Sequence, residues 1–230
     1  MCRNCHSPGE AGTRRRFLSQ IVAGALAAPA LLRAASVRAA ARRGGAARLI
    51  TPNFNWNFHI RQERQFVGYL KSLPGLPPVS FEGGVRPDQL EKLCDYSILC
   101  TNYLTAVKNP DHLSNLREYA LQGGVIYIDH CTGVEPDRDL FERAHLACFA
   151  ALFPGSPIRR LGPRHPLFSA YYPVDLDDLS ARPIYGVFDD DRMIALLSMV
   201  GLFCGWPDRP WFVPKALRML TNIYAYGVKS

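Results

Sequence analysis

The sequence predicts an α/β domain built around a mainly parallel sheet. Short apolar runs of strand length alternate with longer segments in which apolar residues recur every three or four positions. This alternation is typical of β-α units, in which each strand is followed by a helix that covers the sheet. Val125–Asp129 supports the prediction, because it is apolar at nearly every position, as expected of a strand covered on both faces.

Three β-α steps are predicted in the first half of the domain. Strand-like segments lie at Arg48–Thr51, Leu76–Ser80 and Tyr96–Cys100, and helical patterns lie at Ile60–Leu73 and Pro87–Leu93. In the second half, Asn109 and Pro110 are typical of a helix start, and Gly123 is typical of its end. The remaining predictions are a helix at Asp137–Leu152, a hairpin of Ile184–Phe188 with Met193–Ser198, and a final helix at Pro214–Tyr226.

A twin-arginine export signal is predicted at the amino end. The pattern of a hydroxyl residue, paired arginines, Phe and Leu is carried by Arg14, Arg15, Phe17 and Leu18. The apolar run Ile21–Leu32 that follows is too short for a helix across a bilayer core of about 30 Å, so no stable transmembrane anchor is expected. A small-residue cleavage pattern lies near Ala39–Ala41. The alternative is a disordered tail rich in Ala and Arg.

The predicted organisation has three parts. Residues 1–41 form the twin-arginine signal peptide, 42–46 a linker, and 47–230 a single α/β domain. The twin-arginine translocase is therefore an expected partner, and the folded domain is expected in the periplasm or outside the cell. Whether the leader is cleaved or retained stays open.

The net charge of +7 belongs to the leader. Residues 1–43 hold eight arginines and one acid, which leaves 19 basic and 19 acidic residues for 44–230. Because affinity for a nucleic-acid backbone comes mainly from an excess of Lys and Arg, no nucleic-acid partner is expected.

Neither a cofactor nor a disulfide framework is expected. Cys2 to His6 spells the C-x-x-C-H pattern of covalent haem attachment, but these residues precede the export signal and would be left behind with it. The cysteines of the domain are odd in number and scattered, which favours buried free thiols, with one disulfide after export as an alternative. The histidines and carboxylates show no short ligand spacing, so no bound metal is predicted.

Several segments together resemble a bacterial family known as domain of unknown function 4159. They are Leu116–Tyr119 with Gly123, Gly124 and Asp129, then His165–Phe168, Gly205 with Trp206, and Asn222–Tyr226. The resemblance spans Ala47 to the carboxyl end and implies a three-layer fold similar to class I glutamine amidotransferases, of flavodoxin-like type. Those enzymes need a cysteine on a tight turn between small residues, and no G-x-C-x-G occurs here. The resemblance therefore implies a fold and not a reaction.

Asp129, His130 and Cys131 are the leading catalytic candidates. Ligands of open parallel sheets bind beyond the carboxyl ends of the strands, and these three residues end the strand at Val125–Asp129. His165 is a fourth candidate, as a second polar residue of the same cleft. In the alternative interpretation Asp129 bonds loop amides, His130 faces solvent and Cys131 packs as a small apolar residue, while His165 holds a loop.

An Asn-rich aromatic loop is the candidate ligand-binding segment. Asn53, Asn55, Trp56 and His59 combine amides with aromatic rings, a composition that suits a sugar or a peptide; the alternative is a loop folded over the sheet edge. The sequence favours a non-catalytic exported domain that binds a ligand or an envelope protein. The alternative function is a hydrolase or transferase acting through Asp129, His130 and Cys131.

Overall fold

The computed structural model describes residues 45–51, 59–77, 81–179 and 182–229. The predicted export signal (1–41) and residues 42–44 of the predicted linker (42–46) lie outside these residues, as do Asn53, Asn55 and Trp56. No helix within the described ranges is long and apolar enough to cross a membrane.

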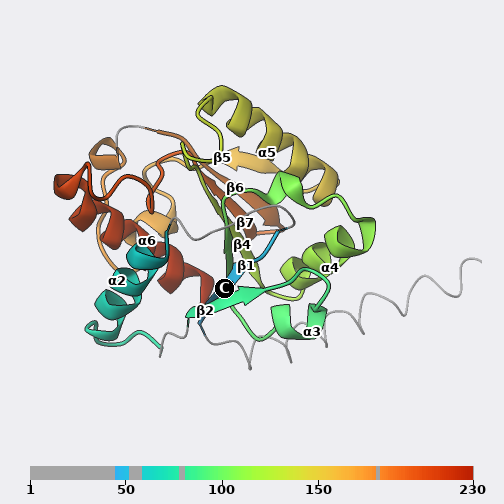
Figure 1. Ribbon diagram of the computed structural model, residues 1–230, viewed down its shortest axis with the longest axis horizontal. Helices are drawn as coiled ribbons and strands as arrows, with labels where there is room; N and C mark the ends of the chain where they lie inside the picture. The colour runs from blue at the N-terminus through green and yellow to red at the C-terminus, as the bar shows by residue number, and fades with distance from the viewer. Residues whose placement is uncertain (1–44, 52–58, 78–80, 180–181, 230) are drawn as a thin grey trace, which may run out of the picture. The chain divides into compact units, whose positions relative to one another are not determined.

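Seven strands form one sheet in the order β2-β1-β3-β4-β7-β6-β5 (Figure 1). The five strands from β2 to β7 are parallel to their neighbours, whereas β6 is antiparallel to both β7 and β5. The strands are β1 (Ala46–Leu49), β2 (Phe81–Val85), β3 (Ile98–Thr101), β4 (Val125–Asp129), β5 (Ile158–Arg160), β6 (Ile184–Asp189) and β7 (Arg192–Ser198). The predicted mainly parallel α/β sheet is confirmed.

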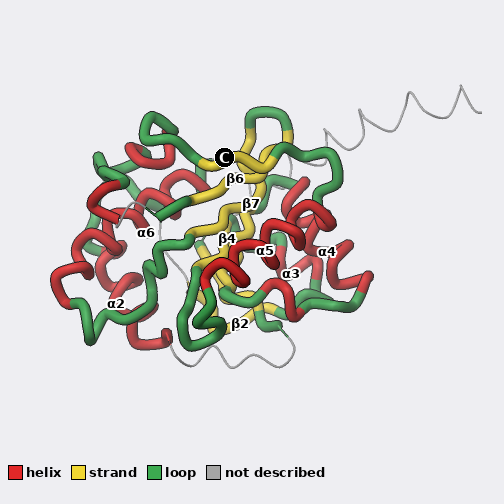
Figure 2. The backbone as a smooth tube through the Cα atoms, turned by 90° about the horizontal axis from the view of Figure 1, so that it is seen from above, coloured by secondary structure: helices red, strands yellow, loops and turns green. Residues whose placement is uncertain are grey.

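Helices cover both faces of the sheet (Figure 2). One core contains residues of α2 (Ile60–Lys71) and α6 (Val213–Gly227) together with alternate residues of the strands, such as Val125 and Tyr127. The other core contains the intervening strand residues, such as Ile126, with residues of α3 (Leu90–Leu93), α4 (Pro110–Leu121) and α5 (Arg138–Leu152). Four short 3₁₀ turns complete the described elements, at Leu104–Ala106, Pro166–Ser169, Asp177–Leu179 and Pro210–Phe212.

The predicted helix starts of α4 and α5 are confirmed by their caps. The Asn109 side chain accepts a hydrogen bond from the Asp111 N–H at 2.9 Å, and Pro110 occupies the first turn. The Asp137 carboxylate accepts from the Leu140 N–H at 3.0 Å. The predicted hairpin is also confirmed: β6 and β7 pair antiparallel, and Asp190 at the turn has φ of 54°.

The two edges of the sheet differ from the predictions. The second strand was predicted at Leu76–Ser80, but β2 lies at Phe81–Val85 and includes Gly83 and Gly84, and β5 was not predicted. An edge strand pairs on one side only, and β5 is a three-residue strand with two exposed arginines. Patterns that identify buried strands therefore miss it. The first strand begins two residues earlier than predicted, at Ala46.

Candidate cysteine and histidine site

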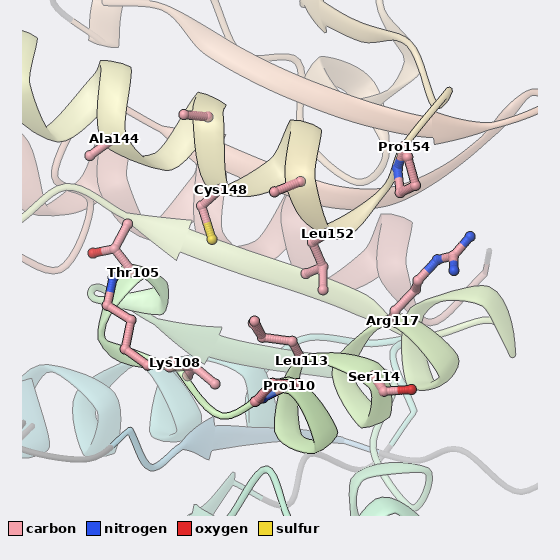
Figure 3. Close-up of a pocket in the computed structure, with 13 residues that line it drawn as sticks. Thr105, Lys108, Pro110, Leu113, Ser114, Arg117, Ala144, Cys148, Leu152 and Pro154 are labelled. Carbon is pink, nitrogen blue, oxygen red and sulfur yellow. The ribbon is translucent and has the colours of Figure 1, made fainter.

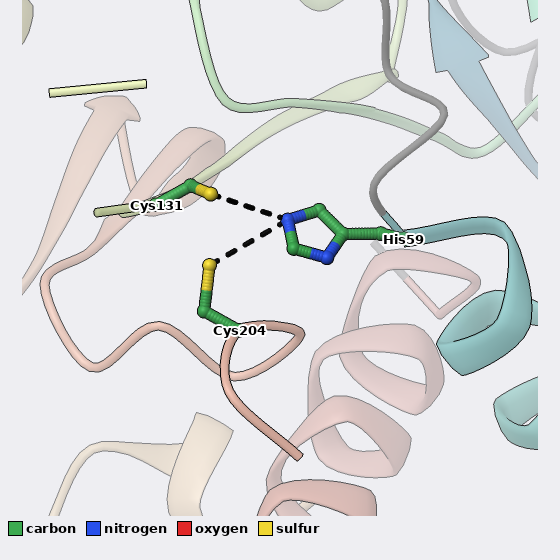
Figure 4. Close-up of side chains that lie close together, drawn as sticks. All are labelled: His59, Cys131 and Cys204. Carbon is green, nitrogen blue, oxygen red and sulfur yellow. Dashed lines mark hydrogen bonds between the residues drawn. The ribbon is translucent and has the colours of Figure 1, made fainter. Parts of the chain in front are cut away.

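His59, Cys131 and Cys204 converge at the carboxyl edge of the sheet (Figure 4). Nε2 of His59 lies 3.3 Å from Sγ of Cys131 and 3.5 Å from Sγ of Cys204. The three donor atoms all lie within 4.8 Å of one another, and each side chain is at most 8% exposed. The cluster thus places two sulfurs and one imidazole nitrogen around a common buried point.

Three separate elements bring these side chains together. Cys131 follows the end of β4 by two residues, Cys204 lies in the loop after the neighbouring strand β7, and His59 directly precedes α2. In parallel strands the carboxyl ends meet at one edge, which explains why two loops distant in sequence lie side by side. Gly201 has φ of +72°, and a Cβ there would lie 3.1 Å from the His130 carbonyl oxygen. Glycine therefore lets the loop that carries Cys204 approach the end of β4.

Asp129 holds this loop in place. Its buried carboxylate accepts hydrogen bonds from the N–H groups of Leu202 at 3.0 Å and Phe203 at 2.9 Å. Burial raises the pKa of Asp129 to about 6, and the two backbone donors act against that rise. Asp129 thus bonds loop amides, as the structural alternative proposed, although the loop belongs to β7 and not to its own strand.

His130 has partners different from those of its two neighbours. Its Nε2 donates to the Glu135 carbonyl oxygen at 3.2 Å, and its ring lies edge-on to Phe141 with centroids 4.9 Å apart. The expectation that His130 faces solvent is wrong, because the residue is only 2% exposed. Strand alternation explains the separation: Asp129 and Cys131 lie on the α2 side of the sheet, whereas His130 lies on the α5 side.

His165 also lies with other partners. Its Nδ1 accepts from the Leu167 N–H at 3.2 Å and so caps the turn Pro166–Ser169. Its ring contacts those of Phe188 and Tyr226. His165 therefore holds a loop, which is the alternative role inferred for it from the sequence.

The two thiols of the cluster differ in their proton affinity. The hydrogen bond from the Cys204 thiol, the hydrogen bond from His59 and the charge of His59 lower the pKa of Cys131 well below its ordinary value, although burial opposes them. The hydrogen bond to Cys131 is the largest cause that raises the pKa of Cys204, and burial is the second. The two shifts are opposite in direction, so Cys131 is the more acidic of the two thiols. All five described cysteines are free thiols.

Two further polar side chains are buried at the same edge. Thr51 follows β1 and Asn102 follows β3; they are 3% and 1% exposed. Within the described residues, Thr51 Oγ1 and both polar atoms of the Asn102 carboxamide have no hydrogen-bond partner. Buried polar groups without partners are costly, so Thr51 and Asn102 are two further candidates for contact with a ligand at this edge.

Cys204 was not among the candidates from the sequence. It lies six residues beyond a predicted strand, in a loop with glycines at Gly201 and Gly205. The available signal was positional, since Cys131 and Cys204 both follow predicted strands. His59 was a candidate, but as part of a sugar- or peptide-binding loop. The short ligand spacings used to search for metal sites miss this cluster, because its members are 72 and 73 residues apart.

The fold and the cluster together define a layered α/β domain with a buried thiol and imidazole site at the carboxyl edge of its sheet. The chain belongs to the family described as Domain of unknown function (DUF4159), whose profile matches residues 47–228. The resemblance found in the sequence is thus confirmed for the family. No curated protein matches the chain.

Proposed function

We propose that this chain is an exported metal-binding protein that holds one thiophilic ion, foremost Zn²⁺, through His59, Cys131 and Cys204. The observation that carries the proposal is the convergence of three buried donor atoms within 4.8 Å of one another. The sequence-based prediction of no metal rested on short ligand spacings, which do not describe donors assembled from three distant segments.

The distances between the donors suit a metal ion. Zinc binds thiolate sulfur at about 2.3 Å and imidazole nitrogen at about 2.0–2.1 Å, which separates the two ligand atoms by about 3.5–3.8 Å at tetrahedral to trigonal angles. The distances from Nε2 to the two sulfurs, 3.3 and 3.5 Å, differ from this by a few tenths of an ångström. One Nε2 carries a single hydrogen or a single lone pair, so it cannot bond both sulfurs well. An ion between the three atoms satisfies all of them.

The donor set also selects the kind of metal. Calcium and magnesium take oxygen ligands, whereas thiolate with imidazole suits Zn²⁺ and Cu⁺. Three protein ligands leave a fourth coordination position, where a bound Zn²⁺ would act as a Lewis acid. We propose binding and not catalysis, because Asp129, the nearest candidate base in sequence, is occupied by two backbone N–H groups.

Export and the finer fold type are part of the same proposal. The twin-arginine pattern at Arg14 and Arg15, the short apolar run and the cleavage pattern support delivery to the periplasm by the twin-arginine translocase. A protein of the cell envelope is the expected partner.

The order of the parallel strands, with helices on both faces, supports a flavodoxin-like or amidotransferase-like fold type.

Cobalt substitution tests the metal site. The full chain carries Cys2→Ser and Cys5→Ser, so that leader thiols cannot bind, and is treated with reductant and chelator before Co²⁺ is added. We expect one equivalent to bind, with a sulfur-to-cobalt charge-transfer band in the near ultraviolet and displacement by Zn²⁺. Cys131→Ser and Cys204→Ser should each weaken that band and lower affinity at least tenfold, and His59→Ala should lower affinity similarly.

Cys94→Ser is the matched control, because Cys94 is a half-buried thiol that bonds Gln122 outside the cluster. It should leave the cobalt spectrum unchanged. Urea unfolding of each variant in chelator establishes that it is folded. A folded parent protein without the charge-transfer band, or a spectrum insensitive to both site cysteines, would overturn the proposal.

A further inference from the structure

A cavity lies on the other face of the sheet, between α4 and α5 (Figure 3). It has a volume of about 650 Å³, within the size range of sites for small organic ligands. Its floor includes Val107, Leu113 and Leu152, of which Val107 and Leu152 are buried. The cluster of His59, Cys131 and Cys204 lies beside α2, on the opposite side of the sheet.

Small residues on α5 create this cavity. Ala144, Ala147, Cys148 and Ala151 line it along the helix, and all have short side chains. Figure 3 shows the Cys148 and Leu152 side chains directed from α5 toward Leu113 of α4. Because these alanines are too short to reach α4, an apolar trough remains between the two helices.

The charge at this trough is of one sign. Of the residues that line it, all in the described part of the chain, Lys108 and Arg117 are charged and none is acidic. Figure 3 shows these two cations toward opposite ends of the trough. Lys108 precedes Asn109, the N-cap residue of α4, and so lies near the helix end where the backbone dipole adds positive potential. Asp111 lies in that turn but does not line the trough.

We propose that this trough binds a free fatty acid, with its chain along the apolar floor and its carboxylate at Lys108. The floor suits an alkyl chain, and the cations suit an anionic headgroup. The basic leader of this same chain has the wrong charge to occupy the trough. The half-buried Cys148 thiol lines the trough together with Lys108, so its chemical modification can report on the occupant.

Protection of Cys148 from alkylation tests the proposal directly. The full chain is treated with N-ethylmaleimide, alone or with dodecanoate below its micellar concentration, and modification of each cysteine is measured by peptide mass spectrometry. We expect dodecanoate to slow modification of Cys148 at least fivefold and to leave Cys94 unchanged. Dodecyltrimethylammonium has the same chain with a cationic head and should protect at least tenfold more weakly. Equal protection by both amphiphiles would overturn the proposal.

Amino-acid substitutions test where the alkyl chain and the carboxylate of the fatty acid bind. Ala147→Leu fills the trough from an exposed helix position and should abolish protection, whereas Ala150→Leu, exposed on α5 outside the lining, should not. Lys108→Glu should weaken dodecanoate binding at least tenfold and strengthen binding of the cationic amphiphile, and Arg117→Glu should change dodecanoate binding less than threefold. The reverse order of the two charge variants, or binding unaffected by Ala147→Leu, would contradict the assignment. Cys131→Ser should retain dodecanoate binding, which separates this site from the cluster of His59, Cys131 and Cys204.

Discussion

The carboxylate of Asp129 accepts a hydrogen bond from the Phe203 N–H at 2.9 Å and thereby ties the end of β4 to the loop after β7. Cys131 stands two residues after Asp129, and Cys204 directly follows Phe203. The residue that the sequence suggested as a catalytic acid or base thus fixes the relative position of two cysteines. Its contribution to the site is one of positioning, and it can be measured as stability and as metal affinity.

Asp129→Asn should destabilise the domain by about 2 kcal/mol, because an amide replaces one of two carboxylate acceptors and leaves a buried N–H without a good partner. Urea unfolding of the chelator-treated protein measures this. The same variant should also lower affinity for Co²⁺. Asp189→Asn removes an exposed carboxylate 3.7 Å from Arg192 and should cost less than about 0.5 kcal/mol. Equal unfolding free energies for the two variants would show that the hydrogen bonds from Leu202 and Phe203 to Asp129 do not stabilise the domain.

Gly201→Ala should cost more than Gly155→Ala. Both glycines have positive φ, so both variants strain the backbone by about 1 kcal/mol or more. A Cβ at Gly155 meets nothing within 4 Å, whereas one at Gly201 lies 3.1 Å from the His130 carbonyl oxygen. The difference between the two unfolding free energies therefore reports the close approach of the Cys204 loop to β4. Only Gly201→Ala should weaken cobalt binding.

His145 should make the domain sensitive to acid. It is 1% exposed, its Nδ1–H donates to the Phe141 carbonyl oxygen at 2.8 Å, and burial lowers its pKa from 6.5 to about 4. The folded state therefore favours neutral His145, so this stabilisation is complete above pH 6.5 and is lost as pH falls toward 4. The difference between the two pKa values corresponds to about 3 kcal/mol of unfolding free energy.

His145→Gln is the matched variant, because Gln does not titrate in this range. Between pH 7.5 and 4.5 the parent protein should lose about 2–3 kcal/mol more unfolding free energy than the variant. Other titrating groups cancel in this difference, apart from the neighbouring His130, whose pKa is also lowered by burial. Parallel pH profiles for the two proteins would show that His145 is already protonated or solvated in the folded state.

Export should depend on the paired arginines. Replacing Arg14 and Arg15 together by Lys keeps the charge but removes the pattern that the twin-arginine translocase recognises. We expect the protein to disappear from the periplasmic fraction and to accumulate in the cytoplasm, as measured by immunoblotting. Arg3→Lys lies outside the pattern and should be exported normally. Normal export of the double variant would refute the twin-arginine route.

The sequence predicted the interior of the sheet better than its edges. Val125–Asp129 was recognised because a strand covered on both faces is apolar throughout, and α4 was recognised because Asn109 and Pro110 are strong start signals. At the edges, Phe81–Val85 contains two glycines and Ile158–Arg160 contains two exposed arginines. Pairing with β1 and β6 makes these segments strands, and such tertiary pairing leaves little trace in local composition.

The sequence predicted where the candidate site lies but not which residues form it. The carboxyl end of β4 was identified from the topology of parallel sheets, and Cys131 with it. Cys204 required knowledge of which strand lies next to β4, and that order follows from packing of the whole domain. His130 was assigned to the site from its place in the sequence, but alternation along the strand directs it to Phe141.

The assembly of the cluster from α2, β4 and the loop after β7 also bears on when a metal can be acquired. An unfolded chain keeps Cys131 and Cys204 apart, so the proposed metal site would form only after the sheet has formed. If the chain crosses the membrane already folded, loading takes place beforehand, from the ions available inside the cell. The identity of the metal bound to the exported protein would then depend on the ions present in the compartment in which it folded.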